Sequence, residues 1–211
     1  MKKHFYPIFA LFLVGVMFSC QSPKSNSTKE EAAGIDSMAP NPFITHMYTA
    51  DPSAHVWADG RLYVYASHDI DPPRGCDLMD RYHVFSTDDM VNWTDHGENL
   101  NSSQVPWGRK EGGFMWAPDC AYKDGTYYFY FPHPSDTKWN DSWKIGVATS
   151  KEPAANFTVQ GYIEGMDPLI DPCVFVDDDG QAYIYNGGGQ ICKGGKMEDN
   201  LGGVGGGMGG M

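Results

Sequence analysis

The chain has 211 residues, of which 41% are apolar, 14% aromatic and 20% charged, and its formal net charge is −12. This content of apolar and aromatic residues excludes disorder along the whole chain and favours β-strands. The surplus of acidic residues leaves no basic field to hold a polyphosphate backbone, so nucleic acid is not an expected partner and a neutral or cationic ligand is favoured. The many flat aromatic faces are also suited to binding a sugar.

The first 20 residues have the pattern of an exported lipoprotein. Two lysines precede an apolar run over residues 5–18, which is shorter than the roughly 20 residues of a membrane-spanning helix and fits a signal peptide. The run ends in the letters VMFSC, residues 16–20, which resemble a loose bacterial lipobox with Cys20 as the lipidated residue. We therefore expect residues 1–20 to be a lipoprotein signal peptide and the protein to be membrane-anchored in the bacterial periplasm or at the cell surface. The alternative is a plain signal peptide in which Cys20 has no role.

Two further segments are expected to lack a fixed fold. Residues 21–40 are rich in Ser, Lys, Glu and Ala without periodicity, which predicts a flexible tether. Residues 190–211 are rich in glycine, and such a tract buries too little surface to offset its ordering entropy, so we expect a disordered tail. The folded part is then residues 41–189.

One phrase occurs three times in the folded part and predicts three β-hairpins. Each copy has a proline next to an aspartate, a strand-like run, an Asp-Gly pair, and then aromatic or β-branched residues. Asp-Gly between two such runs is a strong hairpin signal, because Gly accepts the positive φ of a tight turn. The glycines of the three predicted turns are Gly60, Gly125 and Gly180.

A second phrase occurs twice, over residues 83–97 and 146–161, with the same spacing from a serine to an aromatic residue and on to a glycine. The two phrases alternate, which gives a four-stranded unit that repeats along the chain, as the blades of a propeller do. A β-sandwich is the competing all-β fold, but it seldom repeats a whole four-strand unit. We expect an all-β, partial β-propeller of about two and a half blades, whereas a closed ring generally has at least four.

Three aspartates stand near the predicted starts of successive inner strands, namely Asp51, Asp119 and Asp171. Proline biases the residue before it towards an extended backbone, and the starts of inner strands converge on the axis of a propeller. Glycoside hydrolysis needs carboxyl groups brought together in this way, because one accepts a proton from water and another donates a proton to the leaving oxygen. The alternative is that each Asp only caps a turn by accepting backbone N–H groups. Spacing alone does not choose between the two.

Four segments resemble glycoside hydrolase family 43 and follow one another in the order of that family. They are TADPS at residues 49–53, STDDMVNWTDHG at 86–97, GFMWAPD at 113–119 and IDPCVFVDDDG at 170–180. The resemblance implies the N-terminal part of a five-bladed propeller of the β-xylosidase or α-L-arabinofuranosidase type, which hydrolyses xylo-oligosaccharides or hemicellulose side chains with inversion. It further implies that Asp51 is the general base, that Asp171 orients the general acid and raises its pKa, and that Trp116 forms part of the sugar-binding wall. Core packing is the alternative role of Trp116.

The resemblance also implies a general acid, a Glu on the next blade, for which this sequence has no matching position. Glu198 is the only Glu after Gly189, and it lacks aromatic, strand-forming neighbours, so we do not transfer the role to it. Loss of general acid catalysis costs on the order of 10²–10⁴ in rate, so we expect these 211 residues to release little or no p-nitrophenol from aryl glycosides. This pattern favours a truncated copy or an altered reading frame, with a natural glycine-rich linker as the alternative. A non-catalytic carbohydrate-binding lipoprotein and a non-functional fragment are the alternative functions.

No cofactor and no metal site are expected from the sequence. The four cysteines after Cys20 have no CxxC pair and are expected to be mostly buried free thiols. The histidines, His55 among them, have no paired metal-ligand spacing and are expected to be surface or core residues. The acidic run Asp177–Asp179 is expected to form a solvated turn rather than a Ca²⁺ site. The resemblance implies a structural calcium ion only in the full-length family fold, through a histidine of a later blade.

Overall fold

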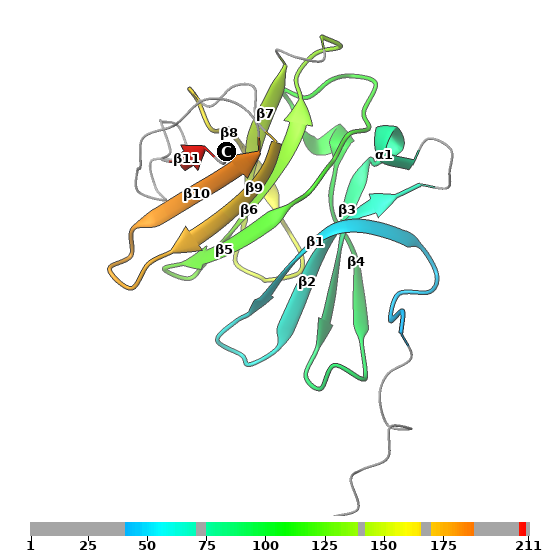
Figure 1. Cartoon of the computed structure of the whole chain (residues 1–211), viewed down its shortest axis with the longest axis vertical. Coiled ribbons are helices and arrows are strands. Elements are labelled where there is room, and N and C mark those ends of the chain that lie inside the picture. Colours follow the sequence, from blue (N-terminus) through cyan, green and yellow to red (C-terminus); the bar gives the residue numbers. More distant parts are fainter. Residues whose placement is uncertain (1–40, 71–74, 139–141, 166–169, 188–206, 210–211) are drawn as a thin grey trace, which may run out of the picture. The chain divides into compact units, whose positions relative to one another are not determined.

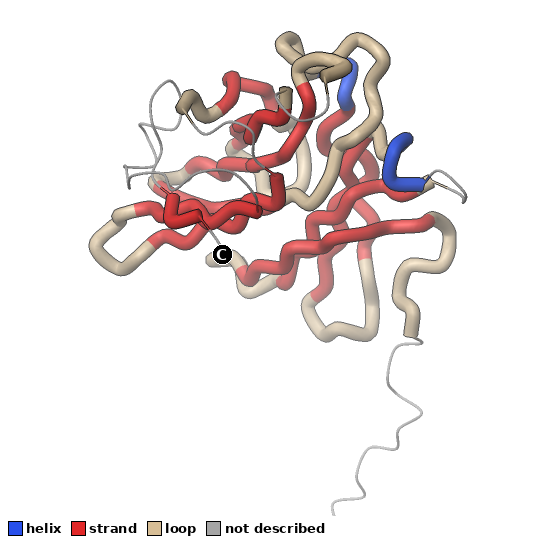
Figure 2. Tube along the Cα trace, turned by 45° about the horizontal axis from the view of Figure 1, so that its top comes forward, coloured by secondary structure: helices blue, strands red, loops and turns tan. Residues whose placement is uncertain are grey.

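The computed structural model describes residues 41–70, 75–138, 142–165, 170–187 and 207–209. Strands dominate the trace (Figure 2), and the helical pieces among the described residues are α1 (Gly75–Leu78) and a 3₁₀ turn, Ser102–Gln104. The all-β prediction is confirmed. Cys20 with the predicted signal peptide, the tether and most of the predicted tail lie outside the described residues.

Among the described residues, no helix combines the length and the apolar character that crossing a membrane requires.

Two four-stranded antiparallel sheets form the first two blades. Blade 1 has the strand order β1-β2-β3-β4 and blade 2 the order β5-β6-β7-β8. A third sheet contains the hairpin β9–β10, the first hairpin of a third blade, and β11 pairs with β10 in parallel within the segment predicted to be a disordered tail. The strands are β1 (Tyr48–Val56), β2 (Leu62–Asp69), β3 (Arg81–Thr87), β4 (Thr94–Asn101), β5 (Asp119–Lys123), β6 (Thr126–Pro134), β7 (Trp143–Ser150), β8 (Thr158–Tyr162), β9 (Ile170–Val176), β10 (Ala182–Gly187) and β11 (Gly207–Gly209).

All three predicted Asp-Gly turns join the first two strands of a sheet, but they use two geometries. In the β5–β6 hairpin both Asp124 and Gly125 have positive φ, 48° and 75°, as a two-residue type I′ turn requires. In the β1–β2 and β9–β10 hairpins the turn is longer, and its glycine, Gly60 or Gly180, has a φ of 81° or 82°. A left-handed glycine at this position lets the longer turn rejoin the ladder, so the repeated phrase predicts the hairpins correctly although the turns differ.

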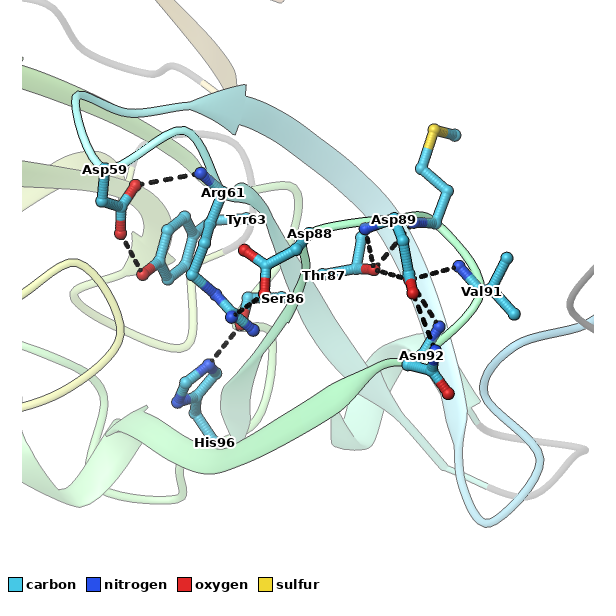
Figure 3. A network of polar contacts seen from close by, with 11 residues as sticks. Asp59, Arg61, Tyr63, Ser86, Thr87, Asp88, Asp89, Val91, Asn92 and His96 are labelled. Atoms are coloured by element: carbon cyan, nitrogen blue, oxygen red, sulfur yellow. Dashed lines mark hydrogen bonds and ion pairs between the residues drawn. The ribbon is translucent and has the colours of Figure 1, made fainter.

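A polar network ties the β1–β2 turn of blade 1 to the neighbouring hairpin β3–β4 (Figure 3). The guanidinium of Arg61 donates to Ser86 Oγ at 2.9 Å and forms an ion pair with Asp88. Ser86 Oγ is also 2.7 Å from His96 Nε2, on the adjoining strand. The network lies at the far end of the hairpins, away from the starts of the inner strands, and holds the blade's outer turns in register.

The core between the sheets is built on the central strand β6, which is buried on both faces. Phe129 and Phe131 belong to the apolar cluster shared with blade 1, whereas Tyr128 and Tyr130 belong to the cluster shared with β9 and β10. Successive strand residues point to opposite faces, so this alternation packs blade 2 between its two neighbours. Contacts between blades, rather than a single closed core, therefore position the inner strands.

The thiols depart from the prediction that they are mostly buried. Among the described cysteines, which are free, Cys120 is buried but Cys76 and Cys173 are exposed. Cys173 lies between Pro172 and Val174, which are both buried, and strand alternation turns its side chain to the opposite face of β9. The prediction was wrong for these two residues because a single cysteine carries no signal for the face of the strand it occupies.

Candidate functional site

The starts of β1, β5 and β9 line one pocket of about 560 Å³. β5 lies between β1 and β9 (Figure 1), so the pocket receives residues from all three sheets. Asp51, Asp119 and Asp171, predicted to converge from separate blades, all line it. The described residues that line it are Asp51, Pro52, Ser53, Ala54, His55, Ala117, Pro118, Asp119, Asp171, Pro172 and Cys173.

Asp51 and Asp171 occupy the same local structure in their respective blades. The pairing of β1 with β2 shifts between Ala50 and Ser53, and the pairing of β9 with β10 shifts in the same way across the second Asp-Pro pair. Each Asp-Pro pair is thus a β-bulge, a feature that re-aims side chains near active sites. The two aspartates have φ values of 49° and 53°, so the prediction of an extended backbone before proline was wrong. The bulge, rather than the proline, determines the backbone conformation of Asp51 and Asp171.

Asp119 occupies a different position from the other two aspartates. It follows its proline, and it pairs with Tyr130, the fifth residue after its turn glycine. The residues with the equivalent pairing in the other hairpins are Ser53, opposite Tyr65, and Cys173, opposite Tyr185. The sequence interpretation grouped the three aspartates together, but by register Asp119 corresponds to a serine and a cysteine.

Asp51 and Asp171 interact electrostatically within the pocket. Asp171 is exposed overall, but the partial desolvation of its carboxyl group and, after it, the negative charge of Asp51 raise its pKa above the ordinary value. Two carboxyl groups close enough to interact in this way resist ionising together. Among the described residues the lining holds three aspartates, His55 and no lysine or arginine. An acidic, partly apolar lining suits a neutral polyhydroxyl ligand and disfavours phosphate.

Trp116 stands beside the pocket lining, next to Ala117, which is part of it. Its indole N–H donates to the Cys76 carbonyl at 2.7 Å, and its ring lies 4.6 Å from that of Trp143 with an interplanar angle of 36°. The ring is partly exposed. The packing role that the sequence left open is therefore present, and the sugar-binding role stays a prediction.

Sequence reasoning missed two residues of this site. His55 was assigned only a surface or core role, yet it lines the pocket and its Nε2 lies 2.7 Å from Asp119 Oδ1. Gly187 was not singled out, yet a Cβ placed there would lie 2.9 Å from Asp171 Oδ2, so a glycine at this position leaves room for that carboxylate. No local motif marks either residue, because both act on partners that are distant along the chain or across a bulge.

The described residues do not form a metal site. No group of three or more His, Cys, Asp or Glu side chains gathers there with the geometry of metal ligands. The acidic run at the β9–β10 turn instead accepts local backbone N–H groups, since Asp177 Oδ1 accepts from Asp178 N and Asp179 Oδ1 accepts from Gln181 N, both at 2.8 Å. The part of the chain that the structure describes therefore offers no cluster of side chains to hold a calcium ion.

Repeated blades whose inner strands bring carboxylates into one acidic pocket provide the paired carboxyl groups that glycoside hydrolysis requires. The sequence profile of glycosyl hydrolases family 43 matches residues 39–203, and the chain belongs to this family.

Curated relatives and solved structures agree with this assignment. A xylosidase/arabinosidase from Humicola insolens is 46% identical over 157 residues, which make up 70% of this chain and 46% of the relative, and a xylosidase/arabinosidase from Bacteroides ovatus is 40% identical over 67% of this chain and 44% of the relative. A β-xylosidase/α-arabinofuranosidase from a compost microbial metagenome, solved with xylotriose in a calcium-free form, has a TM-score of 0.56 and 43% identity, covering 70% of this chain and 44% of that one. The chain thus spans less than half the length of each of these proteins.

Proposed function

We propose that this chain contributes the first blades of an inverting glycoside hydrolase that acts on β-xylosides or α-L-arabinofuranosides in xylo-oligosaccharides and hemicellulose side chains. In this proposal Asp51 is the general base that takes a proton from the attacking water. Asp171 orients the general acid and raises its pKa. We assign the acid to no described residue of the chain.

The observation that carries the proposal is the meeting of two equivalent bulge carboxylates in one pocket. Asp51 and Asp171 come from different sheets, and the raised pKa of Asp171 depends partly on the charge of Asp51. Two neighbouring carboxyl groups, one of which has a raised pKa, can take different roles in glycoside hydrolysis.

The substrate class has independent support from the pocket and from the relatives. The acidic lining without lysine or arginine among the described residues favours an uncharged ligand, and Trp116, whose ring is partly exposed, directly precedes the lining residue Ala117. We assign Trp116 to the sugar-binding wall, where an aromatic face packs on the C–H surface of a sugar. A solved family 43 enzyme from Xanthomonas citri, 38% identical, was crystallised with xylotriose.

The test uses two substrates whose leaving groups differ in their need for protonation, so that the role of the general base can be measured although the general acid is missing. A 2,4-dinitrophenyl β-xyloside has a leaving group that departs without protonation, whereas the p-nitrophenyl compound depends more on general acid catalysis. We expect the 211-residue chain to hydrolyse the former measurably and the latter little. Asp51→Asn should lower the rate on the dinitrophenyl substrate by on the order of 10²–10⁴. Asp178→Asn, in an exposed turn, is the matched control and should leave the rate unchanged.

Two further measurements complete the test. Proton NMR of the first sugar released from the β-xyloside should show the α anomer, as inversion requires. Binding of xylotriose, followed by calorimetry, should persist in Asp51→Asn. Equal rates for the Asp51 and Asp178 variants would contradict the base assignment, and binding of xylotriose without any turnover of either substrate would favour the carbohydrate-binding alternative.

We also propose that the protein is an exported bacterial lipoprotein anchored through Cys20, in the periplasm or at the cell surface. The support is the sequence pattern of residues 1–20. Expression with a labelled fatty acid should incorporate label into the protein, and Cys20→Ala should abolish this and release the protein from the membrane fraction. Unlabelled protein of normal abundance would contradict the proposal.

A further inference from the structure

The pocket contains a buried carboxylate that the proposed chemistry does not use. Asp119 has 3% of its surface exposed. Its Oδ1 lies 2.7 Å from His55 Nε2 and accepts the backbone N–H of Cys120 at 2.8 Å, while its Oδ2 accepts the backbone N–H of Val174 at 2.5 Å. A buried carboxylate is costly unless its oxygens are hydrogen-bonded, and here both oxygens are.

These bonds join three strands that belong to three different sheets. His55 is on β1, four residues after Asp51, and Val174 is on β9, three residues after Asp171. β1 and β9 are each the edge strand of their sheet, and β5 lies between them. No ladder of backbone hydrogen bonds connects the three strands, so side chains must set their relative position. Asp119 is bonded to both neighbours at once.

The register of the strands explains why the carboxylate lies on β5. The equivalent positions on β1 and β9 carry Ser53 and Cys173, whose side chains are too short to bridge two strands. His55 is in turn held flat against Trp57, with ring centroids 4.9 Å apart and an interplanar angle of 12°. The imidazole is thereby fixed on its own strand, and its bond to Asp119 transmits the position of β1 to β5.

We infer that Asp119 and His55 form a clasp that sets the separation of Asp51 and Asp171, and that both are positioning residues for the reaction. The inference rests on the proposed function for its catalytic consequence, but the geometry of the clasp does not depend on it. A misplacement of about 1 Å can cost on the order of 10²-fold in rate, so an unclasped β1 should impair catalysis without removing any group that takes part in the chemistry.

Two substitutions of His55 distinguish a clasp from a residue that merely packs. In His55→Gln the side-chain amide N–H can take the place of Nε2 and donate to Asp119, whereas His55→Ala removes the donor. We expect His55→Ala to lower kcat on the dinitrophenyl xyloside about 10- to 100-fold with little change in KM, and His55→Gln to recover most of the loss. A rise in KM with an unchanged kcat would overturn the inference, because it would mean that His55 contacts substrate directly.

A second readout requires no turnover. The pKa of Asp171 can be followed by carbon-13 NMR of the Asp carboxyl groups, with the Asp171→Asn variant giving the assignment. If the clasp holds Asp51 near Asp171, the raised pKa of Asp171 should fall towards its ordinary value in His55→Ala and in Asp119→Ala and stay raised in His55→Gln. Asp178→Asn is the control. An unchanged pKa in folded His55→Ala would overturn the inference, whatever the fate of Asp119→Ala.

The kinetic measurement and the titration of Asp171 distinguish failure of the proposed function from failure of the clasp. Absence of turnover in the unsubstituted chain would count against the proposed function, while the titration of Asp171 would still decide whether the clasp exists. Normal turnover in His55→Ala, with circular dichroism like that of the unsubstituted chain, would refute the clasp and leave the proposed function standing.

Discussion

Acidification should destabilise the protein through one histidine of blade 2, His133 on β6. The side chain has no exposed surface, and its ring lies 5.8 Å from that of Trp107 in an edge-to-face arrangement. A Cβ on Gly108 would lie 2.5 Å from Nε2, so the backbone of Gly108 packs closely against that atom. Burial lowers the pKa of His133 to about 4, and the positive charge of Arg109 acts in the same direction, against opposing backbone groups.

The size of the effect follows from the two protonation states. Unfolding exposes the imidazole, which then has an ordinary pKa of about 6.5. Between pH 6.5 and 4 the unfolded chain binds a proton that the folded protein does not, so the free energy of unfolding falls as the pH falls. A pKa difference of about 2.5 at 1.36 kcal/mol per unit corresponds to a loss of about 3 kcal/mol by pH 4. Above pH 7 this contribution is nearly constant.

Urea unfolding at pH 7 and at pH 4 measures this contribution by difference. The loss of stability between the two pH values should be smaller in His133→Phe than in the unsubstituted protein by about 3 kcal/mol, even if the variant is less stable at both, because all other titrating groups cancel. Val56→Thr, at a residue that is 63% exposed and does not titrate, is the control. If His133→Phe and the unsubstituted protein lose the same amount of stability, the proposed burial of a neutral imidazole is refuted.

Two packing predictions test the core around β6. Phe129 has no exposed surface and contacts Tyr82 of blade 1 edge to face, with ring centroids 5.0 Å apart. Phe129→Ala should therefore lower the free energy of unfolding in urea by about 3–5 kcal/mol, whereas Phe175→Ala, at a residue that is 52% exposed, should lower it by less than about 1 kcal/mol. Equal losses would contradict the packing described. Gly146→Ala would bring a Cβ within 2.3 Å of the fully buried ring of Phe131 and should lower the free energy of unfolding by about 1–3 kcal/mol. Thermal unfolding would detect this loss, and an unchanged Tm would refute the prediction.

The sequence predicts the hairpins and their order because both signals are local. Asp-Gly acts within a few residues, and the aromatic and β-branched runs around it suit strands wherever they pack. The repeat of the two phrases then predicts four-stranded blades. Even the meeting of Asp51 and Asp171 in one pocket follows from this repeat, since equivalent positions in successive blades of a propeller face the same axis.

The bulge and the clasp could not be predicted in the same way. Proline before a strand favours an extended neighbour in general, but Asp51 and Asp171 are left-handed because two residues face one across the ladder. Such a shift in register depends on the partner strand. The role of Asp119 depends on His55 and Val174, which lie 64 and 55 residues away along the chain. No periodicity links these three residues, so only the packing of the blades reveals them.

The bulges and the clasp together determine how Asp51 and Asp171 lie relative to each other. The bulge turns the carboxylate of Asp51 or Asp171 within its own strand, and the missing N–H of the following proline is tolerated there because a bulge already leaves the ladder unpaired. A bulge cannot, however, fix the distance between two strands of different sheets. In this protein that distance depends on a carboxylate whose donors come from both neighbours. Substitutions at the clasp should therefore alter how strongly Asp51 and Asp171 interact, whereas substitutions at the bulges should alter where each carboxylate points.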